Sequence, residues 1–274
     1  MRAREWEKVL LDATEKVRLR VAPLALGGDR GRTVGVGAAG DTTIFADKEA
    51  EDVLLGALKG LGGVRVLSEE AGAVGDTSAR TLAVVDPLDG SSNFERGIPF
   101  YCTSVAMVEG DTMKDVTLGV VRDLVSGDVY VARRGEGARK NGEPIKTSGI
   151  SVPSRAVVGV DLSGSAAGVV SGLASLVSGV KRQVHLGANA LELCYLAEGR
   201  IDAFVDLRGR IRITDLAAAY LIAAEAGAEI TDVEGEELES VFDLQHRFSF
   251  VASANVALHK EIMELCRASG GRKR

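Results

Sequence analysis

Two residue types that often carry chemistry are scarce in this 274-residue chain, which has only three cysteines and three histidines. An odd set of widely spaced cysteines, Cys102, Cys194 and Cys266, favours buried free thiols in a reducing compartment. The scattered histidines offer little basis for a zinc site of the usual His/Cys kind. If the protein binds a metal, oxygen atoms must hold it, which favours hard cations such as Mg²⁺.

Long apolar runs are also missing. No run approaches the roughly 20 residues that a membrane-spanning helix needs, and the charged N-terminus lacks the apolar core of a signal peptide. The net charge of −6 and the pI near 5.3 disfavour general binding to nucleic-acid phosphates. We therefore expect a cytoplasmic protein with no nucleic-acid or membrane partner.

The first half of the chain is predicted to mix helices and strands. Apolar periodicity predicts helices over 3–20 and 47–59. Between them lies a glycine-rich loop, Gly27–Gly40, which is long enough to act as a lid but can equally be an ordinary variable loop. Short apolar runs then predict strands, followed by the turn-rich segment 135–144. The predicted strands are 64–67, 81–85, 103–108, 116–121 and 128–133.

Beyond about residue 150 strands and helices alternate. The predicted strands are 156–162, 180–184, 201–207 and 248–252, and the predicted helices are 166–177, 188–197, 215–226 and 256–268. No internal repeat or linker is evident. We expect a layered fold of mixed α and β class, with an N-terminal α+β half over 1–150 and a C-terminal α/β half over 151–274.

Acidic residues stand at the ends of two predicted buried strands. Glu69 and Glu70 follow one apolar run, and Asp86 and Asp89 follow the next. Buried carboxylates repel one another and are costly unless a cation compensates them, and a pair of divalent cations about 4 Å apart would do so. Each motif also has a simpler interpretation, because Asp-Pro-Leu-Asp-Gly favours surface turns and Asp215 suits the first turn of a helix. Their occurrence together favours a metal site.

The residues Asp86-Pro-Leu-Asp-Gly-Ser-Ser-Asn-Phe94 resemble the signature of the inositol monophosphatase and fructose-1,6-bisphosphatase superfamily. Ser68-Glu69-Glu70, the segment Asp41–Asp47 and Thr214-Asp215-Leu216-Ala217-Ala218 resemble its other motifs, in the expected order. Thr214 replaces the usual tryptophan. The likeness covers nearly the whole chain and is strongest to archaeal and bacterial members that also cleave fructose 1,6-bisphosphate. It implies a layered αβαβα sugar-phosphatase sandwich.

The resemblance also implies two or three Mg²⁺ ions in each active site, with Mn²⁺ as a substitute. Glu69, Asp86 and the Leu88 carbonyl would hold the first ion. Asp86, Asp89 and Asp215 would hold the second.

Further roles follow from the same resemblance. Glu70 and Asp41 would assist a third, looser ion. Ser91 together with Asp47 would orient and deprotonate the attacking water. The backbone amides of Gly90 to Ser92 would cradle the phosphate, as amide-rich turns suit anions.

Substrate choice is expected to lie in the second half. The turn Gly187-Ala188-Asn189 matches a sugar-contacting turn of the family, although Ala188 stands where a hydroxyl residue is common. Arg208, Arg210 and Arg212 alternate with other residues, so an extended strand would place three guanidinium groups on one face and could anchor a second phosphate. A solvated strand edge is the alternative. Monophosphate-preferring relatives tend to have a glutamate at the position of Arg208.

These observations favour a Mg²⁺-dependent phosphomonoester hydrolase of carbohydrate metabolism, acting on fructose 1,6-bisphosphate, inositol 1-phosphate or both. The resemblance implies a homodimer. Two alternatives remain: a 3′-phosphoadenosine 5′-phosphate phosphatase of the same fold, and a non-catalytic regulatory homologue. The second is disfavoured because a scaffold gains nothing from buried acids without a cation.

Overall fold

The computed structural model describes residues 2–76, 78–238 and 242–268, and the polar tail from Gly270 lies outside them. Its helices are α1 (Arg2–Leu26), α2 (Phe45–Leu61), α3 (Ser91–Arg96), α4 (Ala167–Gly172), α5 (Ala174–Gly179), α6 (Asn189–Ala197), α7 (Ile213–Glu225) and α8 (Val256–Ala268). Short 3₁₀ turns cover Met113–Asp115 and Pro153–Arg155. No described helix is long and apolar enough to cross a membrane.

The larger of the two main sheets has eight strands in the order β10-β9-β8-β7-β6-β5-β3-β4. Their bounds are β3 (Val64–Ser68), β4 (Gly72–Gly75), β5 (Thr81–Asp89), β6 (Cys102–Val108), β7 (Val116–Asp123), β8 (Val129–Arg133), β9 (Ala138–Lys140) and β10 (Glu143–Pro144). Only β3 and β5 pair in parallel; the other neighbours are antiparallel. The carboxyl ends of β3 and β5 therefore meet at one edge of the sheet.

The second sheet has five strands in the order β12-β11-β13-β15-β14. Their bounds are β11 (Val157–Val160), β12 (Arg182–Val184), β13 (Ala203–Ile211), β14 (Glu229–Thr231) and β15 (Phe248–Ser253). A separate hairpin pairs β1 (Thr33–Val36) with β2 (Thr42–Ile44). Strand β1 lies inside the predicted loop Gly27–Gly40, and β2 lies just beyond its end.

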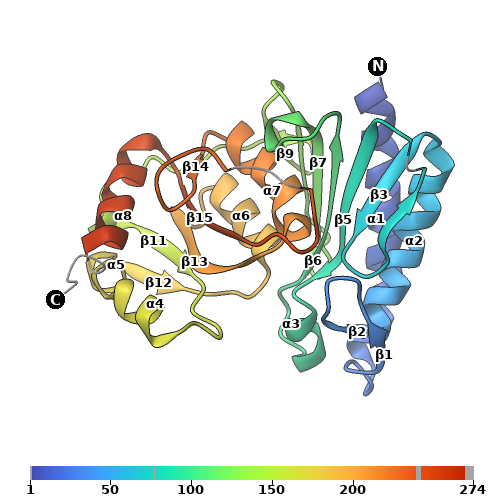
Figure 1. The fold of residues 1–274 in the computed structure, drawn as a ribbon, viewed down its shortest axis with the longest axis horizontal. Helices are drawn as coiled ribbons and strands as arrows, with labels where there is room; N and C mark the ends of the chain where they lie inside the picture. The colour runs from blue at the N-terminus through green and yellow to red at the C-terminus, as the bar shows by residue number, and fades with distance from the viewer. Residues whose placement is uncertain (1, 77, 239–241, 269–274) are drawn as a thin grey trace.

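The elements form five layers, as Figure 1 shows: α1 and α2, the large sheet, α6 and α7, the second sheet, and α4, α5 and α8. Helix α7 contacts β5, β6, β7 and β8, and α6 contacts β13. Every residue of β5 is buried, because helices cover both faces of the sheet. One hydrophobic cluster joins the inner face of the large sheet to the second sheet, from Leu67 and Val84 to Phe204 and Phe250. The predicted mixed α and β fold in five layers is confirmed.

The main differences from the predicted elements lie at element ends and in short strands. Helix α1 runs six residues beyond the predicted end at residue 20, because Val21 and Leu24 continue the apolar face on the core. The predicted helix 166–177 is broken into α4 and α5 at Leu173, beside Gly172. The short helix α3 and the short strands β4 and β14 were not predicted, and β9 and β10 occupy the segment predicted as turns.

Candidate active site

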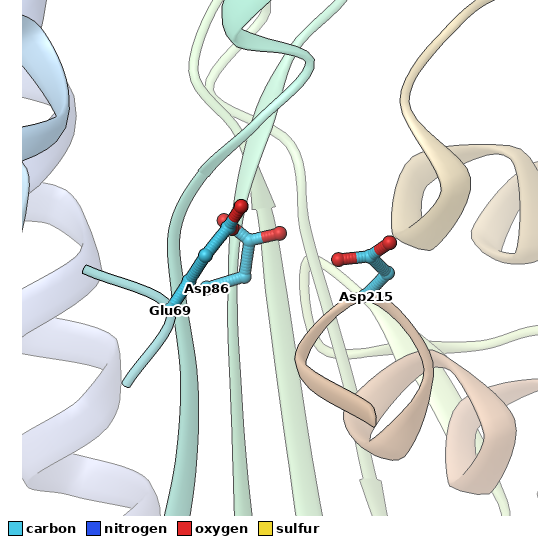
Figure 2. A group of neighbouring side chains, drawn as sticks. All are labelled: Glu69, Asp86 and Asp215. Atoms are coloured by element: carbon cyan, nitrogen blue, oxygen red, sulfur yellow. The ribbon is translucent and has the colours of Figure 1, made fainter. Parts of the chain in front are cut away.

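Three carboxylates converge between the two sheets. Glu69 follows β3 and Asp86 lies in β5, and the Glu69 amide donates to the Val85 carbonyl at 3.2 Å. Asp215 is the third residue of α7 and approaches from the opposite side, so the three side chains point toward one another (Figure 2). One oxygen atom from each carboxylate lies within 4.8 Å of the others. This is the arrangement of oxygen donors that a hard divalent cation requires.

Asp89 completes the acidic group at the end of β5 and also anchors α6. Its carboxylate accepts hydrogen bonds from the amides of Asn189 at 3.1 Å and Ala190 at 2.7 Å. The buried thiol of Cys102 donates to it at 3.5 Å. The Asn189 side chain in turn donates to Asp215 at 3.3 Å. Asp89 therefore joins the end of β5 to the start of α6 at the site.

The pKa values of Glu69, Asp86 and Asp89 are raised, which indicates that a positive charge would stabilise their ionised forms. Burial raises the pKa of Asp86 well above its usual range, and repulsion from Glu69 and Asp89 adds to the shift. Burial and repulsion from Asp215 likewise raise the pKa of Glu69 well above its usual range and that of Asp89 to about 8. A bound divalent cation would favour the charged forms and reverse these shifts.

The predicted catalytic pair lies next to this group on two helices. Asp47 is the third residue of α2, where its Oδ2 accepts a hydrogen bond from the Ile44 amide at 2.8 Å. Burial is the main reason that its pKa is raised to about 8. Ser91 begins α3, directly after Gly90, whose φ of +92° and tight packing against the Phe100 carbonyl require glycine. The described residues show no hydrogen bond between Ser91 and Asp47 themselves.

The two acids predicted to assist a third ion are already engaged. The Thr43 hydroxyl donates to Glu70 Oε2. Asp41, at the tip of the β1–β2 hairpin, forms an ion pair with Arg212. Neither belongs to the close group of Glu69, Asp86 and Asp215.

The predicted sugar-contacting turn Gly187-Ala188-Asn189 lies at the start of α6, facing the end of β5. Asn93, which sequence reasoning did not single out, ties this turn to α3: its Nδ2 donates to the carbonyls of Phe100 and Leu186, each at 2.7 Å. Glu192 holds the turn from behind by accepting the amides of Leu186 and Gly187 at 3.0 and 2.9 Å. The position of Asn93 in the nine-residue signature was the sequence signal that could have identified it.

The interpretation of Arg208, Arg210 and Arg212 as one face of an extended strand is wrong. Gly209 has a φ of +63°, and the pairing of β13 with β15 shifts between Asp206 and Ile211, so the alternation is interrupted. The three guanidinium groups consequently have different neighbours.

Arg208 is bound by two buried acids: it pairs with Asp161, and its Nε lies 3.0 Å from both oxygens of Asp206. Arg210 is exposed beside Gly164 and has no ion pair with the described residues. Arg212 turns toward the acidic group, where its Nη1 lies 2.6 Å from Glu69 Oε1.

Comparison with known proteins gives consistent results. The sequence model of the inositol monophosphatase family matches residues 8–270. A protein of Methanothermobacter thermautotrophicus named fructose-1,6-bisphosphatase/inositol-1-monophosphatase is 38% identical, over 94% of this chain and 95% of its own. A crystal structure titled inositol monophosphatase-fructose 1,6 bisphosphatase superposes with a TM-score of 0.86 at 31% identity, over 95% of this chain and 99% of its own. A bifunctional NADP phosphatase/NAD kinase of Methanococcus maripaludis is 31% identical over 93% of this chain and 48% of its own.

Proposed function

The chain belongs to the inositol monophosphatase family, and we propose that it is a Mg²⁺-dependent phosphatase of small sugar and polyol phosphates. The observation that carries the proposal is the largely buried group of Glu69, Asp86 and Asp215, in which one oxygen atom from each carboxylate lies within 4.8 Å of the others. Relatives named for fructose-1,6-bisphosphatase and inositol-1-monophosphatase activities support the substrate class. We propose fructose 1,6-bisphosphate and inositol 1-phosphate as the first substrates to test.

The chemistry of the donor set fits Mg²⁺ or Mn²⁺. Every donor is an oxygen atom. The neighbouring carboxylates repel one another where water is largely excluded, and a divalent cation would relieve this repulsion. Glu69, Asp86 and the Leu88 carbonyl would hold one ion, and Asp86, Asp89 and Asp215 a second. Bound divalent ions lower the pKa of the attacking water and neutralise charge on the phosphate oxygens.

The chain's own residues would orient the reactants. Asp47 would accept the proton of the attacking water through Ser91, a role supported by its buried position and its pKa of about 8. The Gly90 to Ser92 amides would hold the phosphate for in-line attack. The Ile44 hydrogen bond fixes the Asp47 carboxylate and thereby limits the directions in which it can accept a proton.

For substrate recognition we propose the turn Gly187-Ala188-Asn189 for the sugar and Arg210 for a second phosphate. The position of the turn beside Asp89 and Asp215 supports the first assignment. Arg210 is preferred to Arg208 as a phosphate ligand because Asp161 and Asp206 already compensate the Arg208 charge. An exposed guanidinium needs no internal partner to be displaced before it binds an anion.

A nucleotide phosphatase is the second candidate. The relative named bifunctional NADP phosphatase/NAD kinase favours it, because that name includes a phosphatase with a nucleotide substrate; this chain matches 48% of that protein. A 3′-phosphoadenosine 5′-phosphate phosphatase would use the same metal ligands with a different pocket. A non-catalytic homologue is disfavoured by the same uncompensated acids that support catalysis.

We further propose that the enzyme is cytoplasmic and homodimeric. The free state of all three cysteines supports a reducing compartment. The family resemblance is the basis for the dimer.

The test is phosphate release from fructose 1,6-bisphosphate, inositol 1-phosphate, NADP and 3′-phosphoadenosine 5′-phosphate, with Mg²⁺ and with a chelator. We expect Mg²⁺-dependent release, fastest from the first two. Release from nucleotides alone would favour the second candidate, and no release from any substrate would favour a non-catalytic protein.

Two variants then locate the second-phosphate contact. Arg210→Ala should lower kcat/KM for fructose 1,6-bisphosphate about 10-fold or more, the scale of one charge-assisted hydrogen bond, and leave inositol 1-phosphate hydrolysis unchanged. Arg208→Ala should affect both substrates alike, because it disturbs the ion pairs with Asp161 and Asp206. If Arg208→Ala alone selectively lowered fructose 1,6-bisphosphate hydrolysis, the second-phosphate contact would be assigned to Arg208.

A further inference from the structure

Arg212 lies where the acidic group meets the β1–β2 hairpin. It directly precedes α7, and its side chain is 18% exposed. Nη1 contacts Glu69 Oε1 at 2.6 Å, and Nη2 forms an ion pair with Asp41. Its backbone N–H lies 3.4 Å from Asp215 Oδ2. One residue therefore connects α7, the end of β3 and the hairpin tip.

The hairpin tip is held against the same place by backbone hydrogen bonds. The amide of Ala38 donates to the Glu70 carbonyl at 2.9 Å, and that of Ala39 donates to the Glu69 carbonyl at 3.1 Å. At Gly37 a Cβ atom would clash with the Glu70 carboxylate, so the backbone approaches this acid closely. The docked hairpin thus places Asp41 beside the acidic group, although the Asp41 side chain is 65% exposed.

The charges at this junction explain what Arg212 does. Asp41 and Glu69 approach one another across Arg212, and two such carboxylates without a cation between them would attract a divalent ion. The Arg212 guanidinium contributes a fixed positive charge between them. It binds Oε1 of Glu69, and a carboxylate has a second oxygen atom with which it can bind a cation. A second cation beside the guanidinium would be repelled by it.

We propose that Arg212 is a resident cation of this junction, which ties the hairpin to Glu69 and excludes an additional divalent ion from the space between Asp41 and Glu69. The inference rests on the proposed metal site and makes it more specific: the site holds two divalent ions, and the protein itself contributes the third positive centre. Arg212 is a positioning residue, since it acts through Glu69 and Asp41.

The test counts bound Mn²⁺ per chain by equilibrium dialysis in the wild type, Arg212→Met and Arg20→Met. The control Arg20→Met removes another arginine that joins two elements, through an ion pair between α1 and Glu49 of α2, and neither residue is a proposed ligand. We expect two ions in the wild type and the control, and three in Arg212→Met. Adding Asp41→Asn to Arg212→Met should return the count to two.

Three ions in the wild type, or two ions of unchanged affinity in Arg212→Met, would overturn the proposal. These outcomes leave the proposed metal site intact. Absence of Mn²⁺ binding to the wild type would instead remove the metal site, and the inference with it.

A second readout follows the hairpin itself. With a chelator present, trypsin should cut the segment around Arg30 and Arg32 several-fold faster in Arg212→Met than in the wild type or Arg20→Met, because a docking contact is lost. Arg212→Lys keeps one charge and should bind two ions, but it lacks the fork that spans both acids and should be cut at an intermediate rate. Equal cutting of all four proteins would show that Arg212 does not hold the hairpin.

Discussion

The protein contains two buried acidic groups that differ in where their positive charge comes from. In the second sheet, Asp161 and Asp206 enclose the guanidinium of Arg208, and Asp206 is fully buried. Between the sheets, Glu69, Asp86 and Asp215 come together, and Asp89 adds its charge to theirs. Among the described residues only Glu69 of these four forms an ion pair with an arginine, at the margin of the group.

The difference separates a structural group from a binding site. Buried carboxylates that surround an arginine are compensated within the fold, and removing one partner leaves the other unpaired. Buried carboxylates that face one another raise their own pKa values and create a demand for a cation from outside. The two groups should therefore respond to the same substitution, aspartate to asparagine, in opposite ways.

The largest effect is expected at the metal ligands. Asp86→Asn and Asp215→Asn should each lower turnover by at least ~10²-fold, because each removes a charge that holds a catalytic cation. Asparagine at position 86 keeps Oδ1, which accepts the Leu88 amide at 3.0 Å, so the local turn should survive. Turnover in saturating Mg²⁺ and thermal unfolding in a chelator check this prediction. Near-normal turnover of either variant would remove that residue from the ligand set.

The proposed water-activating pair should give the next largest effect. Ser91→Ala and Asp47→Asn should each lower kcat by about 10²-fold with little change in KM. An asparagine side chain at position 47 can still accept the Ile44 amide through its carbonyl oxygen, so the start of α2 should be preserved. The double variant should be little worse than the worse single variant if the two side chains act as a unit. Fully multiplicative losses would mean that they act separately.

The compensated group should respond through stability. Asp206→Asn leaves Arg208 with one acid in place of two and should lower the free energy of unfolding by ~3 kcal/mol, the scale of breaking a buried ion pair. Chemical denaturation at fixed pH measures this, with Asp86→Asn as the matched substitution in the other group. Without metal, Asp86→Asn should be as stable as the wild type or more stable, because repulsion is relieved. Equal losses in both variants would erase the distinction between the two groups.

A pH dependence also belongs to the uncompensated group. Asp47 and Asp89 have pKa values raised to about 8, so between about pH 4 and pH 8 the folded protein binds more protons than the unfolded chain. The stability of the metal-free protein should therefore fall as the pH rises through this window. Mg²⁺ favours the charged carboxylates, so its stabilising effect should grow with pH. Melting temperatures with chelator and with Mg²⁺ across this range measure the trend; a stabilisation by Mg²⁺ that is independent of pH would contradict it.

Much of the fold could be predicted because the local apolar patterns of the sequence agree with the burial of each element in the layers. The buried run before Asp86 is a strand covered on both faces, and the apolar periodicity after Asp215 is α7. The resemblance carried by Asp86–Phe94 is confirmed by the family match over residues 8–270. The site could be anticipated in part, because strand order decides which chain ends meet, and the motifs come from different layers.

The neighbours of Arg208, Arg210 and Arg212 could not be predicted from the sequence. Alternation predicts one face only if the strand is regular, and the left-handed conformation of Gly209 breaks that regularity. The pairing of Arg208 with Asp161 and Asp206 depends on the neighbouring strand β11 and the loop that follows it, which a local pattern does not contain. The β1–β2 hairpin could not be predicted either, because its strands are short and β1, which is exposed throughout, has no buried face to give an apolar pattern.

The most direct measurement is the change in melting temperature that Mg²⁺ produces in the wild type, Asp215→Asn and Asp206→Asn, at about pH 8, where more of the acids are charged than at lower pH. If the group between the sheets is the metal site, Mg²⁺ should stabilise the wild type and Asp206→Asn by similar amounts and Asp215→Asn far less. Asp206→Asn should start from a lower melting temperature and still respond. Equal stabilisation of all three proteins, or none of the wild type, would contradict the assignment of this group as the divalent-cation site.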